Sequence, residues 1–464
     1  MVFGMGERPP TTLAVLSNRG PVAFQYDDEG QLQARRAGGG LVAVLGPGVV
    51  KTDALWLATG ISEAERAAAA SGEVRVEGYR TRSVALDETR FRQYYDVIAN
   101  QTLWFLVHGM FDLPRRPRFD QAWHRAWSGY ESVNEQFAEA AAAELAPGAT
   151  VVINDYHLAL VPGRLRRLRP DVRSVAFLHT PFCQPHELDV LPEPQADAFI
   201  GGLAGGGACG FHSHRWAAAF EACCRHRGIR TPEVFVSPAV PDATELTAVA
   251  ASAECEDEVR RLEARVGDRR FIVRVDRIEL SKNLLRGFHA FDELLTTEPE
   301  WRDRVTFGAF IYPSRTSLAE YLGYRQEVEA VVRAVNAKWA TAEWTPILLD
   351  EVDNYPRSVA ALRRYDVLVV NPIRDGLNLV AKEGPIVNQH DGVLVLSPGA
   401  GAWDELGGHA VEAHPFDVSA TATAFAAALS IPDDERKCRA VALRKAALAR
   451  TPLDWFGDLL AQAR

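Results

Sequence analysis

Short apolar runs recur along the chain, and each leads into a polar loop and then into a segment with helical spacing. Runs of this length without alternating polar positions are typical of strands buried on both faces of a parallel sheet. We therefore expect an α/β protein with doubly wound parallel sheets. The expected strands are Thr12–Ser17, Leu55–Ala58, Thr150–Ile153, Val172–Leu178, Phe271–Arg274, Val305–Ile311, Pro346–Leu349, Val367–Val370 and Gly392–Leu396, and the expected helices are 61–72, Trp123–Ala146, Glu254–Arg265 and Asp454–Arg464.

The chain is long enough for more than one domain. Its 464 residues exceed what a single hydrophobic core supports. The alternation of strands and helices is interrupted around 230–270, where the Pro-rich segment VFVSPAVPDA precedes a charged helix. Segments of this composition mark domain boundaries, so we predict two Rossmann-like domains at residues 1–237 and 238–448.

Composition and charge exclude several classes of protein. Apolar residues make up 47% of the chain and charged residues 24%, as in ordinary globular proteins. The net charge of −10 argues against a nucleic-acid-binding protein. No apolar run is long enough to span a membrane, and the N-terminus lacks the pattern of a secretory leader. Six cysteines without paired spacing predict reduced, mostly buried thiols in a cytoplasmic protein, and no His/Cys/Asp spacing indicates a metal site.

The most informative stretch is YDVLVVNPIRDGLNLVAKE, from Tyr365 to Glu383. An apolar strand ends at Asn371, and a polar loop then leads into a helix. Open α/β sheets bind ligands at the carboxyl ends of their strands, and a helix N-terminus favours phosphate. Asp375 and Asn378 carry groups that bind hydroxyls. Taken alone, the stretch is also compatible with an ordinary strand–turn–helix.

Cationic and glycine-rich loops follow other expected strands. Arg277 and Lys282 stand at a strand-to-helix transition, where the two cations suit a diphosphate. Arg19 follows the first strand and is placed to bind an anion. Residues 38–40 are glycines that permit close backbone approach to a ligand, but they form neither a dinucleotide fingerprint nor a P-loop. Each of these loops alone is compatible with a solvated surface.

Aromatic and polar residues gather in the first half of the chain. Tyr94, Tyr95 and Trp104 are candidates for the wall of a sugar site, because sugars stack on aromatic faces. A single aromatic residue more often belongs to the core. Asp155 and His179 follow two further strands and therefore point to the same edge of a sheet.

Together these motifs resemble those of the trehalose-6-phosphate synthases, which are retaining glycosyltransferases. The resemblance covers nearly the whole chain. Its carriers are LSNR with AGGGL, YYDVIANQTLW, INDYHL, FLHTPF, VDRIELSKN, YPSR, and NPIRDGLNLVAKE with SPGAGAWDEL. It implies the GT-B fold, in which two Rossmann-like domains face each other across a cleft. It also implies that a C-terminal helix, residues 449–464, crosses back to the N-terminal domain.

The resemblance implies the reaction and its residues. Glucose would pass from a nucleotide-diphosphate sugar to glucose 6-phosphate, giving α,α-trehalose 6-phosphate. The acceptor would be bound by Arg19, Tyr95, Trp104, Asp155 and Arg315. The donor would be bound by Gly39, Gly40, Gly376, Leu377, Asn378, Leu379, Val380 and, at the ribose, Glu383. The catalytic group would comprise Arg277 and Lys282 at the diphosphate and His179 and Asp375 at the donor sugar.

The mechanism implied by the resemblance is front-face transfer, in which the leaving diphosphate takes the acceptor's proton. The sequence shows no convincing pair of carboxylates for double displacement. Catalysis would then rest on positioning and on stabilisation of charge by Arg277 and Lys282. These cations would replace a metal ion, so we expect neither a metal nor another cofactor. Three places depart from the family pattern: the segment after Trp56 lacks a second tryptophan, RIELSKN stands for RLDYSKG, and Gly384 stands for a tyrosine.

Several alternatives stay open at this point. A glucosylglycerol-phosphate synthase or a cyclitol-coupling pseudo-glycosyltransferase would share these motifs. A catalytically silent sugar-phosphate sensor is disfavoured because the catalytic group is intact, and a dehydrogenase is disfavoured because no dinucleotide fingerprint is present. The expected partners are a nucleotide sugar and a sugar phosphate, with neither nucleic acid nor membrane. The nucleotide base and the oligomeric state, including a homo-oligomer, are not readable from the sequence.

Overall fold

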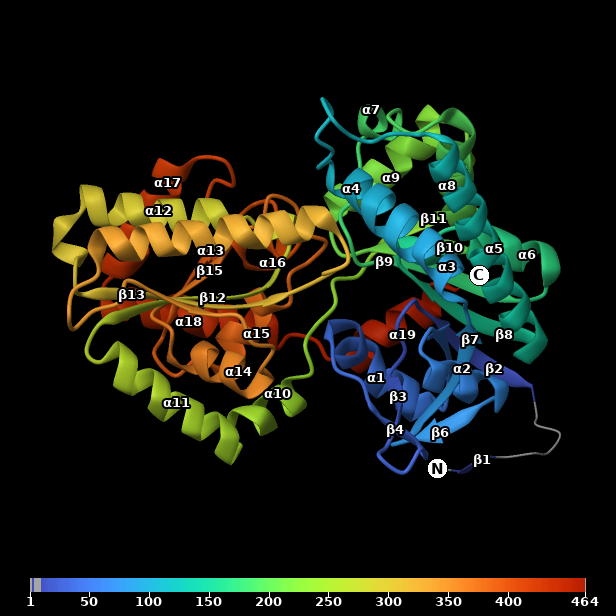
Figure 1. Ribbon diagram of the computed structural model, residues 1–464, viewed down its shortest axis with the longest axis horizontal. Coiled ribbons are helices and arrows are strands. Elements are labelled where there is room, and N and C mark those ends of the chain that lie inside the picture. The colour runs from blue at the N-terminus through green and yellow to red at the C-terminus, as the bar shows by residue number, and fades with distance from the viewer. Residues whose placement is uncertain (1, 4–9, 464) are drawn as a thin grey trace. The chain divides into compact units, whose positions relative to one another are not determined.

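The computed structural model describes residues 2–3 and 10–463, which fall into two compact units (Figure 1). Unit 1 comprises Met1–Ala239 and Pro452–Arg464, and unit 2 comprises Val240–Thr451. Residues 1 and 4–9 of the N-terminus, which lacks the sequence pattern of a secretory leader, lie outside the described residues. None of the helices described is long and apolar enough to cross a membrane.

The described part of unit 1 is built on a nine-stranded sheet. In spatial order its strands are β1 (Val2–Phe3), β6 (Val74–Val76), β7 (Tyr79–Ala85), β5 (Leu55–Gly60), β2 (Thr11–Leu16), β8 (Leu145–Asn154), β9 (Arg173–Leu178), β10 (Ala208–Phe211) and β11 (Glu233–Val236). Neighbours from β7 to β11 pair in parallel, and β1 and β6 pair antiparallel at one edge. The chain moves outward from β2 to β5 and β7 and then returns to the other side of β2 with β8. This reversal is the switch point of a Rossmann-type sheet, where ligands bind.

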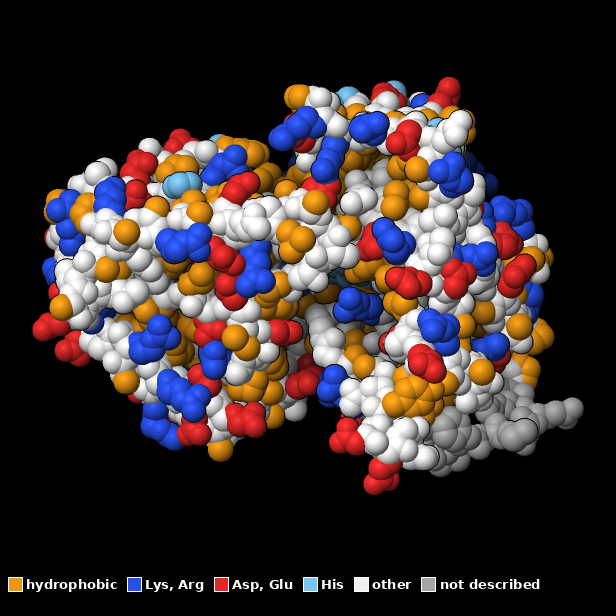
Figure 2. All heavy atoms as spheres, in the orientation of Figure 1, with side chains coloured by type: hydrophobic (Ala, Val, Ile, Leu, Met, Phe, Trp, Pro, Cys, Tyr) orange, Lys and Arg blue, Asp and Glu red, His pale blue; other side chains and the backbone are white. Residues whose placement is uncertain are grey.

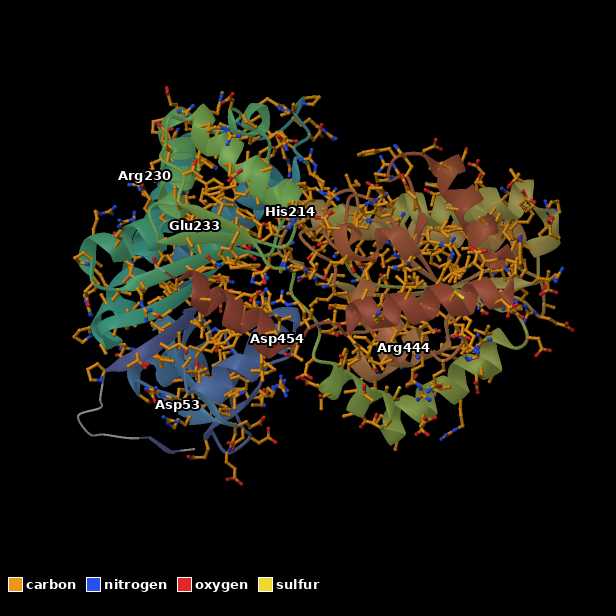
Figure 3. All side chains as sticks on the ribbon, turned by 180° about the vertical axis from the view of Figure 1, so that it is seen from behind. Asp53, His214, Arg230, Glu233, Arg444 and Asp454 are labelled. Atoms are coloured by element: carbon orange, nitrogen blue, oxygen red, sulfur yellow. The ribbon has the colours of Figure 1, made fainter. Side chains whose placement is uncertain are left out.

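Helices pack around this sheet (Figure 1). The helices are α1 (Gly40–Thr52), α2 (Glu63–Ala70), α3 (Glu88–Phe91), α4 (Trp104–His108), α5 (Gln121–Glu144), α6 (Val161–Leu168), α7 (Pro185–Leu188), α8 (Glu193–Ala204), α9 (His214–His226) and α19 (Pro452–Gln462), and the hairpin β3 (Val22–Tyr26) and β4 (Leu32–Arg36) stands apart from the sheet. α6 packs against both α5 and α8. α19, which carries Asp454 (Figure 3), packs on α1, where a side chain at Gly48 would collide with Phe456. The C-terminal helix therefore belongs to the same compact unit as the first strand.

Unit 2 contains a parallel sheet of six strands in its described residues. In spatial order they are β14 (Ile347–Asp350), β13 (Val305–Pro313), β12 (Arg270–Ile278), β15 (Val367–Val370), β16 (Val393–Leu396) and β17 (Val411–Glu412). This is again the Rossmann order, and its switch point lies between β12 and β15. The core includes Phe307, whose ring centroid lies 5.5 Å from Phe288 and 5.4 Å from Phe291.

Helices cover both faces of this second sheet (Figure 1). α12 packs against α13 and α17 on one side, and α11, α14, α15 and α18 form a continuous layer on the other. The bounds are α10 (Ala243–Ala250), α11 (Ala253–Val266), α12 (Leu284–Thr297), α13 (Ala319–Trp339), α14 (Tyr355–Arg364), α15 (Val380–Val387), α16 (Trp403–Leu406), α17 (Val418–Ser430) and α18 (Asp433–Ala447). On the visible face of each unit, acidic and basic side chains are interspersed (Figure 2). This mixture is typical of ordinary protein surfaces.

Most expected strands and helices are confirmed, with two differences that matter for the site. β12 does not end at Arg274, because its pairing with β13 continues through Arg277 and Ile278. Arg277 therefore lies at the end of a strand rather than in a loop. The segment GFHSH from Gly210 resembles a helix entry in the sequence, but Gly210 and Phe211 belong to β10, and α9 begins only at His214 (Figure 3).

Candidate active site

The loops that follow β12 and β15 are bonded to each other at the switch point of unit 2. Lys282 Nζ lies 2.6 Å from Asp375 Oδ2 and 3.9 Å from Asp276 Oδ1. Behind them Arg274 is fully buried. Its Nη2 donates to Asp276 Oδ2 at 3.1 Å, to the Lys282 carbonyl at 2.8 Å and to Asn371 Oδ1 at 3.0 Å. The arginine thus fixes both loops from below.

These contacts set the charge of Lys282. Burial lowers the pKa of the Lys282 ammonium, but the carboxylates of Asp375 and Asp276 outweigh burial and raise the pKa above its ordinary value. Burial raises the pKa of Asp276, and the charges of Arg274 and Lys282 oppose this effect. Lys282 is therefore a persistent cation at the carboxyl end of the sheet, as an anion site requires.

The turn after Lys282 explains one departure from the family pattern. Asn283 has a φ of 60°, a left-handed conformation in which glycine and asparagine are the favoured residues. Its Nδ2 donates to the carbonyls of Asn371 at 3.0 Å and Pro415 at 2.7 Å. The asparagine side chain thereby bonds this turn to the loop after β15, which the family's glycine cannot do.

The loop after β15 is held against the segment that follows β16. The Asp375 amide donates to the Gly399 carbonyl at 3.0 Å, and Asn378 Nδ2 donates to Asp375 Oδ2 at 3.1 Å. A side chain at Gly401 would collide with the Gly376 carbonyl, so this position requires glycine. The close packing fixes the backbone of residues 375–378 at the entrance to α15.

α15 presents two titratable side chains with different environments. Burial raises the pKa of Glu383 to about 7. Lys382 is completely buried, and its Nζ lies 2.6 Å from Glu405 Oε2. Gly384 packs so closely on Leu368 that a side chain there would collide with it. The tyrosine usual in the family therefore has no room in this chain.

Arg277 and Arg315 are brought together in unit 2. Arg277 ends β12 and Arg315 follows the neighbouring strand β13. Both contact the same carboxylate oxygen, Oε1 of Glu279, at 3.2 Å. The structure therefore places one residue expected at the donor beside one expected at the acceptor.

The switch point of unit 1 carries Arg19 after β2 and Asp155 after β8. Arg19 is exposed. Asp155 has a φ of 70°, which is unusual for a residue other than glycine and typical of functional positions. Asn154, just before it, donates from Nδ2 to the Leu16 carbonyl at 3.1 Å and so joins the two strand ends.

A chain of hydrogen bonds fixes His179, which follows β9. The Ala239 amide donates to His212 Nδ1 at 3.2 Å, His212 Nε2 lies 3.2 Å from His179 Nδ1, and His179 Nε2 lies 3.1 Å from Asn154 Oδ1. Because His212 Nδ1 accepts, the consistent assignment has both imidazoles neutral and protonated at Nε2. Burial lowers the pKa of His179 to about 4, which agrees with this assignment.

The aromatic residues of the π-helix Arg92–Leu103 and of α4 have different surroundings. Tyr95 is partly exposed and stacks between Phe91 at 4.8 Å and His157 at 5.7 Å, measured between ring centroids. Trp104 is only 2% exposed. Tyr94 is completely buried, so its expected place in the wall of a sugar site is wrong and it belongs to the core.

The glycine loop of unit 1 leads directly into α1. Gly39 has a φ of 128°, and no described side chain caps the helix, which begins at Gly40. Residues 38–40 are exposed. The amide groups of the first turn are thus available for an anion.

Nearly the whole described chain matches the model of one protein family. The model of glycosyltransferase family 20 matches residues 11–464. The chain belongs to glycosyltransferase family 20. The expected GT-B fold and the expected class of enzyme are therefore confirmed.

Individual relatives of this family 20 member are similar over nearly its full length. It is 32% identical to the trehalose-6-phosphate synthase of Mycolicibacterium smegmatis, over 96% of this chain and 91% of that protein. It is 30% identical to the bifunctional trehalose-6-phosphate synthase/phosphatase of Thermoproteus tenax, over 97% of this chain but only 63% of that longer protein. The solved structure of an alpha,alpha-trehalose-phosphate synthase (UDP-forming) from Burkholderia xenovorans in complex with glucose-6-phosphate has a TM-score of 0.83 and 27% identity, over 97% of this chain and 99% of that one.

Four supporting residues of this glycosyltransferase were not predicted from its sequence: Arg274, Asn371, Asn154 and His212. Arg274, Asn371 and Asn154 lie in or directly after a strand whose carboxyl end carries a predicted residue, and His212 follows β10, the neighbour of the strand that His179 follows. For Arg274, a polar side chain at the end of the apolar run in β12 was a signal that could have found it.

The remaining polar residues add no candidate metal centre. Among residues 2–3 and 10–463, no group of three His, Cys, Asp or Glu side chains is arranged to hold a metal ion. The six cysteines are free, and all but Cys438 are buried, as expected.

Proposed function

We propose that this glycosyltransferase transfers glucose from UDP-glucose to glucose 6-phosphate with retention of configuration, releasing α,α-trehalose 6-phosphate and UDP. The observation that carries the proposal is the pair of cations, Arg277 and Lys282, at the switch point of a Rossmann-type sheet. The names of the relatives support the choice of substrates, because one solved relative is called UDP-forming and was studied with glucose-6-phosphate.

The proposed donor site combines charged side chains with backbone groups. Arg277 and Lys282 bind the diphosphate, and Asp375 and His179 face hydroxyls of the transferred glucose. Glu383 accepts hydrogen bonds from the ribose. Backbone groups complete the proposed donor contacts, at Gly39, Gly40, Gly376, Leu377, Asn378, Leu379 and Val380.

The proposed acceptor site depends on two arginines. Arg19 and Arg315 bind the 6-phosphate, and a bidentate guanidinium suits phosphate oxygens. Asp155 binds hydroxyls of the sugar. Tyr95 offers a partly exposed ring for stacking, whereas Trp104, at 2% exposure, supports the pocket mainly from beneath.

In the proposed step, the bond between the anomeric carbon and the diphosphate oxygen breaks, and its electron pair goes to the diphosphate. A diphosphate oxygen takes the proton of the acceptor hydroxyl, and the new bond forms on the same face of the sugar. Arg277 and Lys282 stabilise the charge that develops on the leaving group. Asp375 is bound by Lys282 and Asn378, so it is placed to orient hydroxyls rather than to attack carbon.

A panel of donors and acceptors tests this proposal. We expect nucleotide release with UDP-glucose and glucose 6-phosphate, at a rate that a metal chelator leaves unchanged because the two cations supply the positive charge. No release with UDP-, GDP- or ADP-glucose would contradict the proposal. Turnover with glycerol 3-phosphate or an aminocyclitol phosphate, but not with glucose 6-phosphate, would instead identify one of the family's other reactions.

A further inference from the structure

Glu279 lies between the two arginines that we assign to the two substrates. Its side chain is only 3% exposed. Oε1 accepts hydrogen bonds from Ser314 Oγ and from Arg315 Nη1, each at 3.2 Å, and lies 3.2 Å from Arg277 Nε. One carboxylate oxygen is therefore surrounded by three donors.

The backbone of Glu279 also contributes to the diphosphate loop. Its carbonyl accepts a hydrogen bond from the Lys282 amide at 3.0 Å, closing the turn that carries this lysine. Its amide donates to the Arg277 carbonyl at 2.8 Å. Glu279 thus contacts three cations: Arg277 at the end of β12, Lys282 after β12 and Arg315 after β13.

Glu279 contacts Arg277 in a way that leaves part of the guanidinium group open to a ligand. Glu279 engages this guanidinium near Nε, and the Arg277 side chain is 49% exposed. Among the described residues, the two terminal nitrogens of Arg277 make no hydrogen bond or ion pair, so they remain for a diphosphate. Glu279 also raises the pKa of Arg277, which keeps the guanidinium charged.

Arg315 is fixed from two sides. Its Nη1 donates to Tyr321 Oη at 2.6 Å as well as to Glu279, and its guanidinium carbon lies 5.2 Å from the centre of the Tyr321 ring. The guanidinium groups of Arg277 and Arg315 contact the same carboxylate oxygen, so they repel each other unless a negative charge lies between them. The buried carboxylate supplies that charge and holds both groups in place.

We propose that Glu279 is a positioning residue that orients Arg277 toward the donor diphosphate and Arg315 toward the acceptor phosphate. This inference rests on the proposed function. Glu279 does not bind phosphate itself, because its carboxylate is an anion and repels the substrates. Its contribution therefore lies in geometry, which affects the transition state more than the bound substrates.

The substitution Glu279→Gln tests this role because it keeps the length of the side chain and removes its charge. We expect kcat to fall at least about tenfold, while KM for both substrates changes by less than about threefold, because looser arginines and the loss of a repelling charge have opposite effects on binding. Glu279→Asp keeps the charge but is one methylene shorter, so it should give a kcat between those of E279Q and the wild type.

Glu258→Gln is the matched control. Glu258 is also buried and also shared by two arginines, with Oε1 2.5 Å from Arg261 Nη1 and Oε2 3.0 Å from Arg357 Nε. It lies on α11, away from the loops of the site. Its kcat should stay within about twofold of the wild type, and thermal melting should show that all variants are folded at the assay temperature.

Three results would overturn the positioning role: a kcat of folded E279Q within twofold of the wild type, an equal loss in E258Q, or a large rise in KM with kcat unchanged. If the wild type itself gives no turnover, the proposed function fails. Calorimetry with pyrophosphate then decides the positioning role. A less favourable binding enthalpy in E279Q than in E258Q supports it, and equal enthalpies contradict it.

Discussion

Replacing Lys282 by alanine removes the cation that pairs with Asp375 in the loop after β15. Its Nζ is 2.6 Å from Asp375 Oδ2, and its side chain is only 12% exposed. In the proposed step this ammonium stabilises the negative charge that develops on the leaving diphosphate. The substitution therefore removes a contact that strengthens as the reaction proceeds.

The structure sets the size of the expected effect. Removing one preorganised group that stabilises a developing anion costs about 3 kcal/mol, or about 100-fold in kcat. Asp375 also loses its cation, whereas Asp276 keeps its contacts with Arg274 at 3.1 Å and 3.2 Å. We therefore expect a loss of stability of about 1–3 kcal/mol from the partly buried carboxylate that has lost its cation.

Steady-state UDP release, with thermal melting in parallel, measures both effects. Lys338→Ala is the matched control, because Lys338 lies 2.9 Å from Asp292 in the same unit but on the exposed surface of α13. Its kcat should stay within about twofold of the wild type. A folded K282A enzyme with a kcat within threefold of the wild type would refute the role assigned to Lys282.

Further predictions concern three other parts of the site: Glu383, His179 and Gly401. Burial raises the pKa of Glu383 to about 7, and only the ionised form accepts hydrogen bonds from both ribose hydroxyls. KM for the donor should therefore rise as the pH falls below 7. Rate assays of E383Q should show no such dependence on pH. The same shift acts on stability with the opposite sign: between about pH 4.5 and 7 the folded state holds a proton that the unfolded chain releases, so the Glu383 contribution should lower the melting midpoint as the pH rises through this window. His179, with a pKa of about 4, should show no titration by NMR between about pH 5.5 and 8, and His212→Ala should lower kcat about tenfold by releasing it. Gly401→Ala introduces a methyl group that collides with the donor loop, so calorimetry should show weaker UDP binding than in Gly408→Ala, where the methyl group meets nothing within 4 Å.

The expected strands and their loops were predicted well because their signal is local. Val367–Val370 is apolar on both faces and ends at a turn, and the structure has a strand with these bounds. The cations at 277 and 282 were identified for the same reason, since they lie at the end of such a strand and directly after it. Short-range patterns thus determine where each strand ends, and in an open α/β sheet this also determines where ligands bind.

The contacts that hold the site together were not predictable in the same way. Glu279 and Arg315 lie 36 positions apart in the sequence, and only the pairing of β12 with β13 brings them together. The chain of hydrogen bonds from Asn154 through His179 to His212 likewise depends on the order of β8, β9 and β10 in the sheet. The burial of Tyr94 beside the partly exposed Tyr95 depends on the π-helical turn that carries both.

The product of UDP-glucose and glucose 6-phosphate tests the central claim most directly. NMR spectroscopy of the reaction with UDP-glucose labelled with ¹³C at the anomeric carbon would show both the new bond and its configuration. We predict an α,α-linked disaccharide phosphate that forms at the same rate as UDP. A β-linked product, or UDP release that yields only free glucose, would contradict the assignment of this chain as a retaining synthase of trehalose 6-phosphate.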